Sequence, residues 1–416
     1  MRASFLLVVS LASGCYLSHE RPRDAGPDSA PEEDAGPDGA GLDGGLDAGL
    51  DGGLDAGTDA GWDAGPEDCD GGFEPGRVSD VDVDLLFVVD NSGSMADEQL
   101  NLTSNFPRMV TALGSGDIDG DGVEDFPPVR NLRVAVVTTD LGIGTRRTTC
   151  EDADGEDGVF RTRPGYSRSC DASYPRFLSF SPGGDLDSFA DDFHCLGRVG
   201  TSGCGIEQPL EAALKALTPA SAETRFTFGS STGHGDGANA GFLRPDSILA
   251  ILFVTDEDDC SFHDRDLWRM DSVRYSGDLR CHDYEAEALH SVERFVEGLG
   301  ALRPDPDRLV VGAITGVPED LVEDPESVDY DAILADDRMQ KRPNPLLPGQ
   351  LLASCSRPRV GAAEPPVRIV QTLRGLGRSS VVQSICSESF EGALIAITSR
   401  LGRAIRRIEC RMEGRT

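Results

Sequence analysis

The sequence predicts a three-layer α/β protein with a mostly parallel central sheet, helices on both faces of the sheet and insertions braced by disulfides. Short apolar runs alternate along the chain with longer segments of helical periodicity, which is the order expected of parallel strands joined by helices. The runs are almost continuously apolar, as in strands that are buried on both faces. Eleven cysteines among 416 residues indicate either metal clusters or an oxidising compartment.

Five segments fit buried strands and four fit helices. The predicted strands cover residues 81–89, 132–138, 247–255, 309–315 and 381–386, and the predicted helices cover residues 95–113, 206–217, 284–299 and 390–408. Pro209 is compatible with its helix only in the first turn. Residues 140–205 and 316–379 are longer than simple connections, so we expect them to be the disulfide-braced insertions. One folded domain then spans residues 80–416.

The charge of the chain limits its partners. Acidic residues number 73 against 38 basic ones, for a formal net charge of -35. Because phosphate binding requires a basic surface, this excess argues against nucleic acid as a partner. It also disfavours electrostatic docking on anionic lipid.

Much of the acid lies in a low-complexity stretch at residues 24–68, where aspartate recurs at every fourth position from Asp43 to Asp63. Each intervening glycine costs a helix about 1 kcal/mol relative to alanine, and there is almost no apolar surface to bury. We therefore expect residues 15–79 to form a disordered, extended tether. A calcium-binding repeat is the alternative.

The N-terminus resembles the signal of a bacterial lipoprotein. A short positive start and an apolar run at residues 5–12, too short to span a bilayer, lead to small residues directly before Cys15. Ala12 stands where the lipobox prefers leucine. The resemblance implies removal of residues 1–14, export and lipidation of Cys15 as the protein's contact with the membrane. Tyr16 then implies the outer membrane of a Gram-negative host. An ordinary signal peptide with an incidental cysteine is the alternative.

Oxygen-bearing side chains follow the first predicted strand at alternate positions. Asp90, Ser92 and Ser94 lie between that strand and the first helix, and ligands of open α/β sheets bind at the carboxyl ends of strands. Alternate residues of a tight turn can aim three oxygens at one point. Hydroxyl and carboxylate oxygens suit a hard cation such as Mg²⁺. Asp256 follows a later strand in the same way.

The Asp-x-Ser-x-Ser motif and the later aspartate resemble the metal-ion-dependent adhesion site of the von Willebrand factor type A domain. The resemblance covers roughly residues 80–410. It implies an Mg²⁺ or Mn²⁺ ion that captures a carboxylate of a partner protein. The ligands that it implies are Asp90, Ser92, Ser94 and Asp256. The alternative is a pair of strand-end turns in which aspartate and serine serve only the turn.

The third element of that family pattern is altered. The family often places a threonine before the helix expected here at residues 206–217, and Cys204 occupies that position. Thr201 or Ser202, just upstream, could reach the ion instead, and Glu207 is another oxygen donor nearby. The coordination of the ion is therefore open at this position.

A second cation site is suggested by a run of acids after the first helix. Three aspartates at alternate positions and a glycine at the sixth match the opening of a calcium loop. Pro128 replaces the final chelating glutamate, so the run resembles the shorter calcium loops of extracellular repeats. An acidic surface turn is the alternative. The candidate calcium ligands are Asp117, Asp119, Asp121 and Asp125.

Lipidation of one cysteine leaves ten for disulfides. As a hypothesis, sequence neighbours pair, and the two ends of the domain are joined. The predicted pairs are Cys150 with Cys170, Cys195 with Cys204, Cys260 with Cys281, Cys355 with Cys386, and Cys69 with Cys410. A zinc site built from Cys260, Cys281, His263 and His282 is the alternative to one of these bridges.

The sequence gives little support for catalysis. It contains no His-Glu-x-x-His helix. We therefore expect an exported, lipid-anchored protein that binds a protein partner through a divalent metal. One alternative is a metal-dependent hydrolase, for which Glu207 and Asp258 are the candidate bases. Another is a structural envelope protein whose metal site is degenerate.

Overall fold

The computed structural model describes residues 73–144, 150, 154–166, 169–267, 279–347, 349–358, 361–412 and 414. The signal segment, Cys15, the acidic repeat and Cys69 lie outside the described residues. Among the helices of the described part, none is both long enough and apolar enough to cross a membrane.

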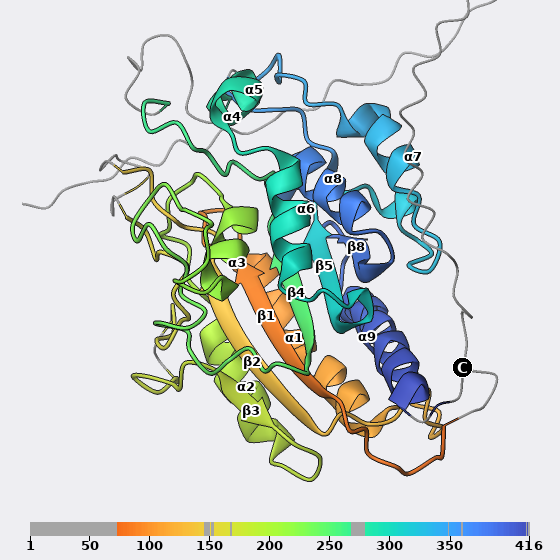
Figure 1. The fold of residues 1–416 in the computed structure, drawn as a ribbon. Coiled ribbons are helices and arrows are strands. Elements are labelled where there is room, and N and C mark those ends of the chain that lie inside the picture. The colour runs from red at the N-terminus through yellow and green to blue at the C-terminus, as the bar shows by residue number, and fades with distance from the viewer. Residues whose placement is uncertain are drawn as a thin grey trace, which may run out of the picture. The chain divides into compact units, whose positions relative to one another are not determined.

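A six-stranded sheet forms the centre of the fold (Figure 1), with the strand order β3-β2-β1-β4-β5-β8. All neighbouring strands pair in parallel except β2 and β3, which are antiparallel. The α/β class and the mostly parallel sheet predicted from the sequence are thus confirmed. The strands are β1 (Asp82–Val89), β2 (Asn131–Thr138), β3 (Leu178–Phe180), β4 (Ile248–Val254), β5 (Leu309–Thr315) and β8 (Ser380–Ser384).

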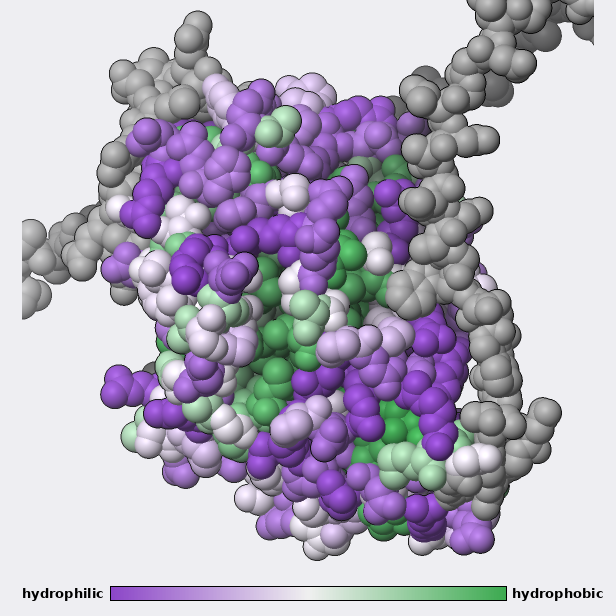
Figure 2. Space-filling model, in the orientation of Figure 1, coloured by the Kyte–Doolittle hydropathy of each residue, from purple (hydrophilic) through white to green (hydrophobic). Residues whose placement is uncertain are grey.

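Helices cover both faces of this sheet, each over its own apolar core. Successive side chains of a strand point to opposite faces, so Phe87 of β1 packs with Phe106 of α1 in one core, and Leu86 packs with Phe295 of α6 in the other. The first core lies under α1 (Ala96–Ser115), α2 (Leu186–Gly197) and α9 (Glu391–Met412). The second lies under α3 (Pro209–Leu217), α6 (Val292–Ala301) and α8 (Val367–Leu376). Hydrophilic residues cover most of the face seen in Figure 2, with apolar residues gathered toward its centre.

Short helices and a hairpin lie at the carboxyl end of the sheet and in the connections between its strands. They include a separate two-stranded antiparallel hairpin, β6–β7. These elements are α4 (Arg280–Asp283), α5 (Glu285–Ala288), α7 (Tyr330–Ala335), β6 (Cys355–Arg357) and β7 (Gly361–Ala363).

Two predicted helices differ in extent from the observed ones. The segment expected to be helical over 284–299 is interrupted, because Leu289 adopts an extended conformation and forms a β-bridge with Phe262. The helix expected from residue 206 begins at Pro209, its first helical residue. Glu207 is consequently on a loop that ends at the carboxyl edge of the sheet.

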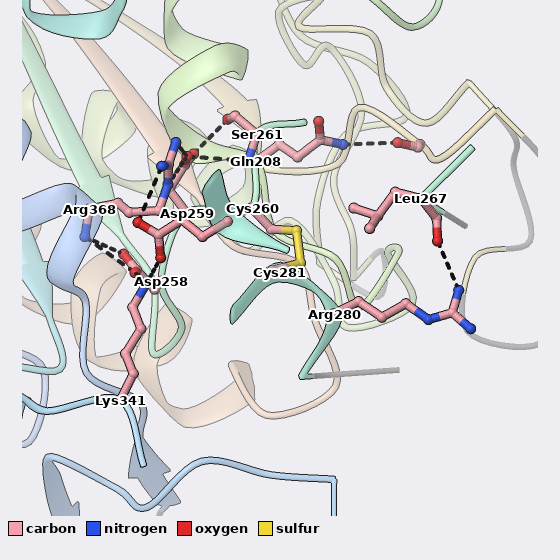
Figure 3. The surroundings of a disulfide bond; sticks show 12 residues. Gln208, Asp258, Asp259, Cys260, Ser261, Leu267, Arg280, Cys281, Lys341 and Arg368 are labelled. Atoms are coloured by element: carbon pink, nitrogen blue, oxygen red, sulfur yellow. Dashed lines mark hydrogen bonds and ion pairs between the residues drawn. A yellow bond between two sulfur atoms is a disulfide. The ribbon is translucent and has the colours of Figure 1, made fainter. Parts of the chain in front are cut away.

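Four disulfides lie in the described residues, and two of the predicted pairings are correct. Cys260–Cys281 (Figure 3) and Cys355–Cys386 are bonded as expected, which excludes the zinc alternative at Cys260 and Cys281. Cys410 is also disulfide-bonded, and its predicted partner Cys69 lies outside the described residues.

The other two predicted pairings are wrong. Cys150 bonds to Cys204, and Cys170 bonds to Cys195. The chain runs away from the end of β2 through β3 and α2 and then returns, so Cys204 comes back to the place where Cys150 left. Proximity in the sequence therefore does not predict proximity in space in this segment.

Candidate metal site

The first strand stands at the point where the order of the sheet reverses. β1 pairs with β2 on one side and with β4 on the other, and Val89 is in register with both Thr138 and Val254. The residues that follow these three, Asp90, Thr139 and Thr255, therefore end neighbouring strands at one edge. In open α/β sheets, the crevice outside such a reversal is where ligands bind.

Asp90 is fully buried, and both of its carboxylate oxygens are fixed. Oδ1 accepts a hydrogen bond from the backbone N–H of Ser92 at 2.7 Å, and Oδ2 accepts one from Oγ1 of Thr255 at 2.7 Å. The Oγ atoms of Ser92 and Ser94 lie 3.1 Å apart. Gln99 of α1 also donates to the carbonyl oxygen of Asp90 at 2.8 Å, so the loop after β1 is held against its helix.

Asp256 lies opposite this loop, two residues beyond the end of β4. Its Oδ1 is buried and accepts no hydrogen bond from the residues that the structure describes. Burial raises the pKa of Asp256 to about 8, and the negative charge of Asp90 adds to the rise, while a hydrogen bond with Ser94 opposes it. The three predicted ligands of the first loop and Asp256 are thus brought to one place.

Glu207 joins these residues from the loop before α3. Oγ1 of Thr139 donates to Oε2 of Glu207 at 2.5 Å, and Oε1 is buried without a partner among the described atoms. Burial raises the pKa of Glu207 well above its usual value, and the charge of Asp90 raises it further. The chain reads Val-Thr-Thr-Asp at the end of β2, and the hydroxyl of Thr139 in this pattern holds Glu207. This pattern is the sequence feature that marks the position of Glu207.

Thr201, the other predicted ligand, sits on the neighbouring loop but faces a different group. It is half-buried, and its Oγ1 lies 3.4 Å from the hydroxyl of Tyr166. The loop itself packs on the loop after β1, since the Gly203 N–H donates to the carbonyl oxygen of Asn91 at 2.9 Å. A Cβ atom on Gly203 would come within 2.3 Å of the Asn91 side chain, so a larger residue here would have to displace that side chain. The sulfur of Cys204 is in a disulfide and is not a ligand.

The acidic run after α1 gathers three of its four predicted ligands. Asp117, Asp119 and Asp125 each offer a carboxylate oxygen, all within 4.8 Å of one another. Asp117 accepts hydrogen bonds from the backbone of Gly120 and Gly122, both of which have positive φ. Asp121 is not part of the group and instead accepts from the N–H of Val123.

A cleft adjoins the first site on the side of β4. It is lined by Glu207, Glu257, Asp258, Asp259, Lys341 and other residues. Asp258 forms an ion pair with Lys341 at 2.7 Å and accepts from the backbone N–H of Arg368 at 3.0 Å (Figure 3). Because these contacts engage both of its oxygens, Asp258 is poorly placed to act as a general base.

The chain matches no protein-family profile and no curated protein. Among solved structures it is similar to proximal thread matrix protein 1 from the mussel byssus, at 14% identity and a TM-score of 0.22, over 57% of this chain and 39% of that one. It is also similar to a pilus adhesin from Streptococcus pneumoniae, at 10% identity and a TM-score of 0.17, over 44% of this chain and 22% of that one. Both TM-scores are too low to show a shared fold. The matched part of this chain spans less than half of the length of either structure.

Proposed function

We propose that this protein is an exported, lipid-anchored protein that binds a protein partner through a divalent cation held at the end of β1 and β4. The observation that carries the proposal is the meeting of two buried carboxylates, Asp90 and Asp256, beside the hydroxyls of Ser92 and Ser94. This arrangement, together with the Asp-x-Ser-x-Ser motif, supports an adhesion site of the von Willebrand type.

The donor set fits a divalent cation. Burying a carboxylate without a compensating charge costs several kcal/mol, and Asp256 has a buried oxygen with no hydrogen-bond partner in the described part of the chain. A cation between the two aspartates would satisfy that oxygen and offset their repulsion. Carboxylate and hydroxyl oxygens are the ligands that Mg²⁺ and Mn²⁺ accept.

The exposure of these residues indicates how a partner would approach. Asp90, Ser92 and Asp256 are buried, whereas Ser94 is exposed. When bound, the ion would supply an attachment point for an oxygen donor from outside, and the resemblance implies that this donor is a carboxylate. The chain's own residues would orient their oxygens toward the ion, and Ser94 would lie at the exposed edge of the site.

Ion binding is measured directly by calorimetry with Mg²⁺ and Mn²⁺. The wild type is expected to bind one ion at this site, and Asp256→Asn is expected to lose it. Asp97→Asn is the matched control, because Asp97 is an exposed acid in the first turn of α1. It should bind the ion as the wild type does. If Asp256→Asn and the wild type behave alike, the aspartates do not form a metal site.

The partner is sought by capture from the cell envelope with and without a chelator. A specific protein that is retained only with the ion, and lost with Asp256→Asn, supports the proposal. Retention that the chelator does not affect contradicts it and favours a structural role.

A further inference from the structure

We propose that the C-terminal end of α9 is a membrane-contact surface, which docks the domain on the headgroups of anionic phospholipids. The inference rests on the lipid anchor of the proposed function and does not depend on the metal site. The surface is formed by arginines of α9 and of the two short turns before β5 and β8, Pro306–Arg308 and Gly377–Ser379. This basic patch consists of Arg308, Arg378, Arg403, Arg407 and Arg411.

The end of α9 is basic in an otherwise acidic chain. Residues 399–412 contain five arginines and one acid, Glu409, whereas the whole chain has a formal net charge of -35. Glu409 is 5% exposed, and its Oε1 accepts hydrogen bonds from Oγ of Ser79 at 2.5 Å and from the N–H of Asp80 at 2.7 Å. The acid of this helix end therefore faces the domain, and the arginines determine the charge that the solvent meets.

The acids beside the basic patch do not neutralise it. Arg411 pairs with Asp305 at 2.8 Å and with Asp307 at 3.1 Å, and both aspartates are shared with other arginines. The other ion pairs join Arg308 to Asp305, Arg378 and Arg407 to Asp307, and Arg403 to Glu326. Five arginines thus share three acids, and the basic patch keeps a positive charge. Arg403 and Arg411 also keep 34% and 45% of their side chains exposed.

The chain enters the domain beside this end of α9. The described residues begin at residue 73, and Figure 1 shows them next to the last turns of α9, in agreement with the contact of Ser79 with Glu409. Cys410 is disulfide-bonded, and its predicted partner Cys69 would tie the tether to the same place. Because the tether leads from here to the predicted anchor, the basic patch lies where the chain arrives from the membrane.

Two exposed apolar side chains accompany the arginines. Val78 is 44% exposed and Met412 is 53% exposed. Val78 directly precedes Ser79, which contacts Glu409, and Met412 directly follows Arg411. Apolar side chains among basic ones suit the boundary between headgroups and acyl chains. An acidic protein surface would leave the apolar side chains unmatched, so the combination favours a bilayer.

The charge of the whole chain disfavours docking on anionic lipid, but the attraction depends on the charge near the contact. Electrostatic attraction to a bilayer falls off within a Debye length of about 8–10 Å, so distant aspartates do not cancel it. Each arginine close to an anionic surface increases the affinity about fivefold. A weak attraction is sufficient here, because a tether holds the domain at a high effective concentration over the membrane.

Docking through the basic patch would direct the candidate metal site away from the bilayer. Asp305 and Asp307 directly precede β5, at the amino edge of the sheet. Asp90 and Asp256 follow β1 and β4, at the carboxyl edge. A strand of eight residues such as β1 spans about 26 Å, so the two edges are well separated. The domain would then present its metal site to a partner while its other edge rests on the membrane.

Vesicle sedimentation of the full chain carrying Cys15→Ala tests the surface without a lipid anchor. The protein is expected to bind vesicles of phosphatidylglycerol and phosphatidylethanolamine more tightly than vesicles of phosphatidylcholine alone. Added salt should weaken the binding, because it screens the charges. Equal binding to both kinds of vesicle, or binding that salt does not affect, would overturn the inference.

The basic patch is tested in the same background by Arg403→Gln combined with Arg411→Gln. This change leaves Arg378 and Arg407 to pair with the buried Asp307. We expect the affinity for the anionic vesicles to fall at least about tenfold. Arg403→Lys combined with Arg411→Lys keeps the charge and should bind nearly as the parent protein does, which separates a loss of charge from a loss of folding.

Arg338→Gln combined with Arg342→Gln is the matched control. It removes the same charge from exposed arginines, 42% and 53% of whose side chains are accessible, on the segment that leads to the cleft beside β4. Its affinity should fall less than about threefold, because these charges lie beyond the screening distance of the contact. Equal losses in the two glutamine variants would contradict the basic patch. Binding to soluble polyglutamate but not to anionic vesicles would assign it to an acidic protein instead. Mass measurement of the N-terminal peptide of the wild type tests the anchor separately from these results.

Discussion

The hydroxyl of Thr255 donates a hydrogen bond of 2.7 Å to Oδ2 of Asp90 and so connects the ends of β4 and β1. The other carboxylate oxygen of Asp90 accepts the N–H of Ser92. These two contacts fix the plane of a buried carboxylate before any ion arrives. Outer-shell partners of this kind orient metal ligands and raise the affinity of the site.

Thr255→Val is expected to weaken Mn²⁺ binding about 10- to 100-fold, since it removes the donor that orients Asp90 and keeps the shape of the side chain. Thr255→Ser retains a hydroxyl and should bind the ion nearly as the wild type does. Titration of both variants by calorimetry provides the measurement. Equal affinity in the valine and serine variants would show that this hydrogen bond does not serve the ion.

Asp256 predicts how the stability of the ion-free protein varies with pH. Its pKa is about 8 in the folded state, against an ordinary value of 3.8 for an aspartate, so between these two pH values the folded chain keeps a proton that the unfolded chain loses. The stabilisation is therefore fully present below about pH 3.8 and is lost as the pH rises toward 8. The free energy of unfolding in urea with a chelator should fall between pH 5 and pH 8.

Asp256→Asn is the control for this pH dependence, because an amide does not titrate and its decline should be smaller. Mn²⁺ competes with the proton, so its affinity for the wild type should increase as the pH rises through 8. If the free energy of unfolding has the same pH slope in the wild type and in Asp256→Asn, the raised pKa of Asp256 is contradicted.

The sequence predicted the sheet better than the connections, for a physical reason. A strand buried on both faces is apolar throughout, as in residues 248–254. The acid that follows it, Asp256, can therefore be recognised in the sequence. The interruption of the helix at Leu289 was not visible, because it depends on a bridge to Phe262 across the fold.

The candidate site was predictable only where its residues follow directly after strands. Asp90 and Asp256 follow apolar runs, whereas the position of Glu207 depends on a hydroxyl 68 residues away in the chain. The pairing of Cys204 likewise depends on how the chain returns after α2. No local sequence pattern specifies how the chain returns to Cys150.

The Cys150–Cys204 disulfide is expected to support both the fold and the ion. Replacing both cysteines by serine should lower the free energy of unfolding by about 4 kcal/mol in the chain-entropy model, because the bond joins residues 54 apart. It should also weaken Mn²⁺ binding, since the segment before Glu207 loses its brace.

Serine replacement of Cys170 and Cys195 is the matched control for that variant. Their bond spans 25 residues, which corresponds to about 3.5 kcal/mol, and it ends on α2 rather than on the Glu207 loop. Urea unfolding should show similar losses in both double variants, and calorimetry should show weaker Mn²⁺ binding only in the first. A similar loss of Mn²⁺ affinity in both would assign the effect to general destabilisation.

Cys15 is predicted to anchor the protein through lipid. Cys15→Ala should release the protein from membranes or leave the precursor uncleaved, because the lipid is attached to the thiol. Fractionation of cells followed by mass measurement of the N-terminal peptide distinguishes these results. A Cys15→Ala protein that is cleaved and sediments with membranes as the wild type does would rule out the lipoprotein assignment.

The acidic loop after α1 is predicted to bind Ca²⁺ through Asp117, Asp119 and Asp125, whose carboxylates converge. A cation that binds only the folded state stabilises it by mass action, so Ca²⁺ should raise the thermal midpoint of the wild type. Asp117→Asn should lose most of this increase. Asp121→Asn is the matched control within the same loop, because Asp121 lies outside the converging group and accepts from Val123 instead. Asp90→Ala should leave the Ca²⁺ response intact, which separates this loop from the site at β1. A wild-type midpoint that Ca²⁺ does not move would identify the run as an acidic surface turn.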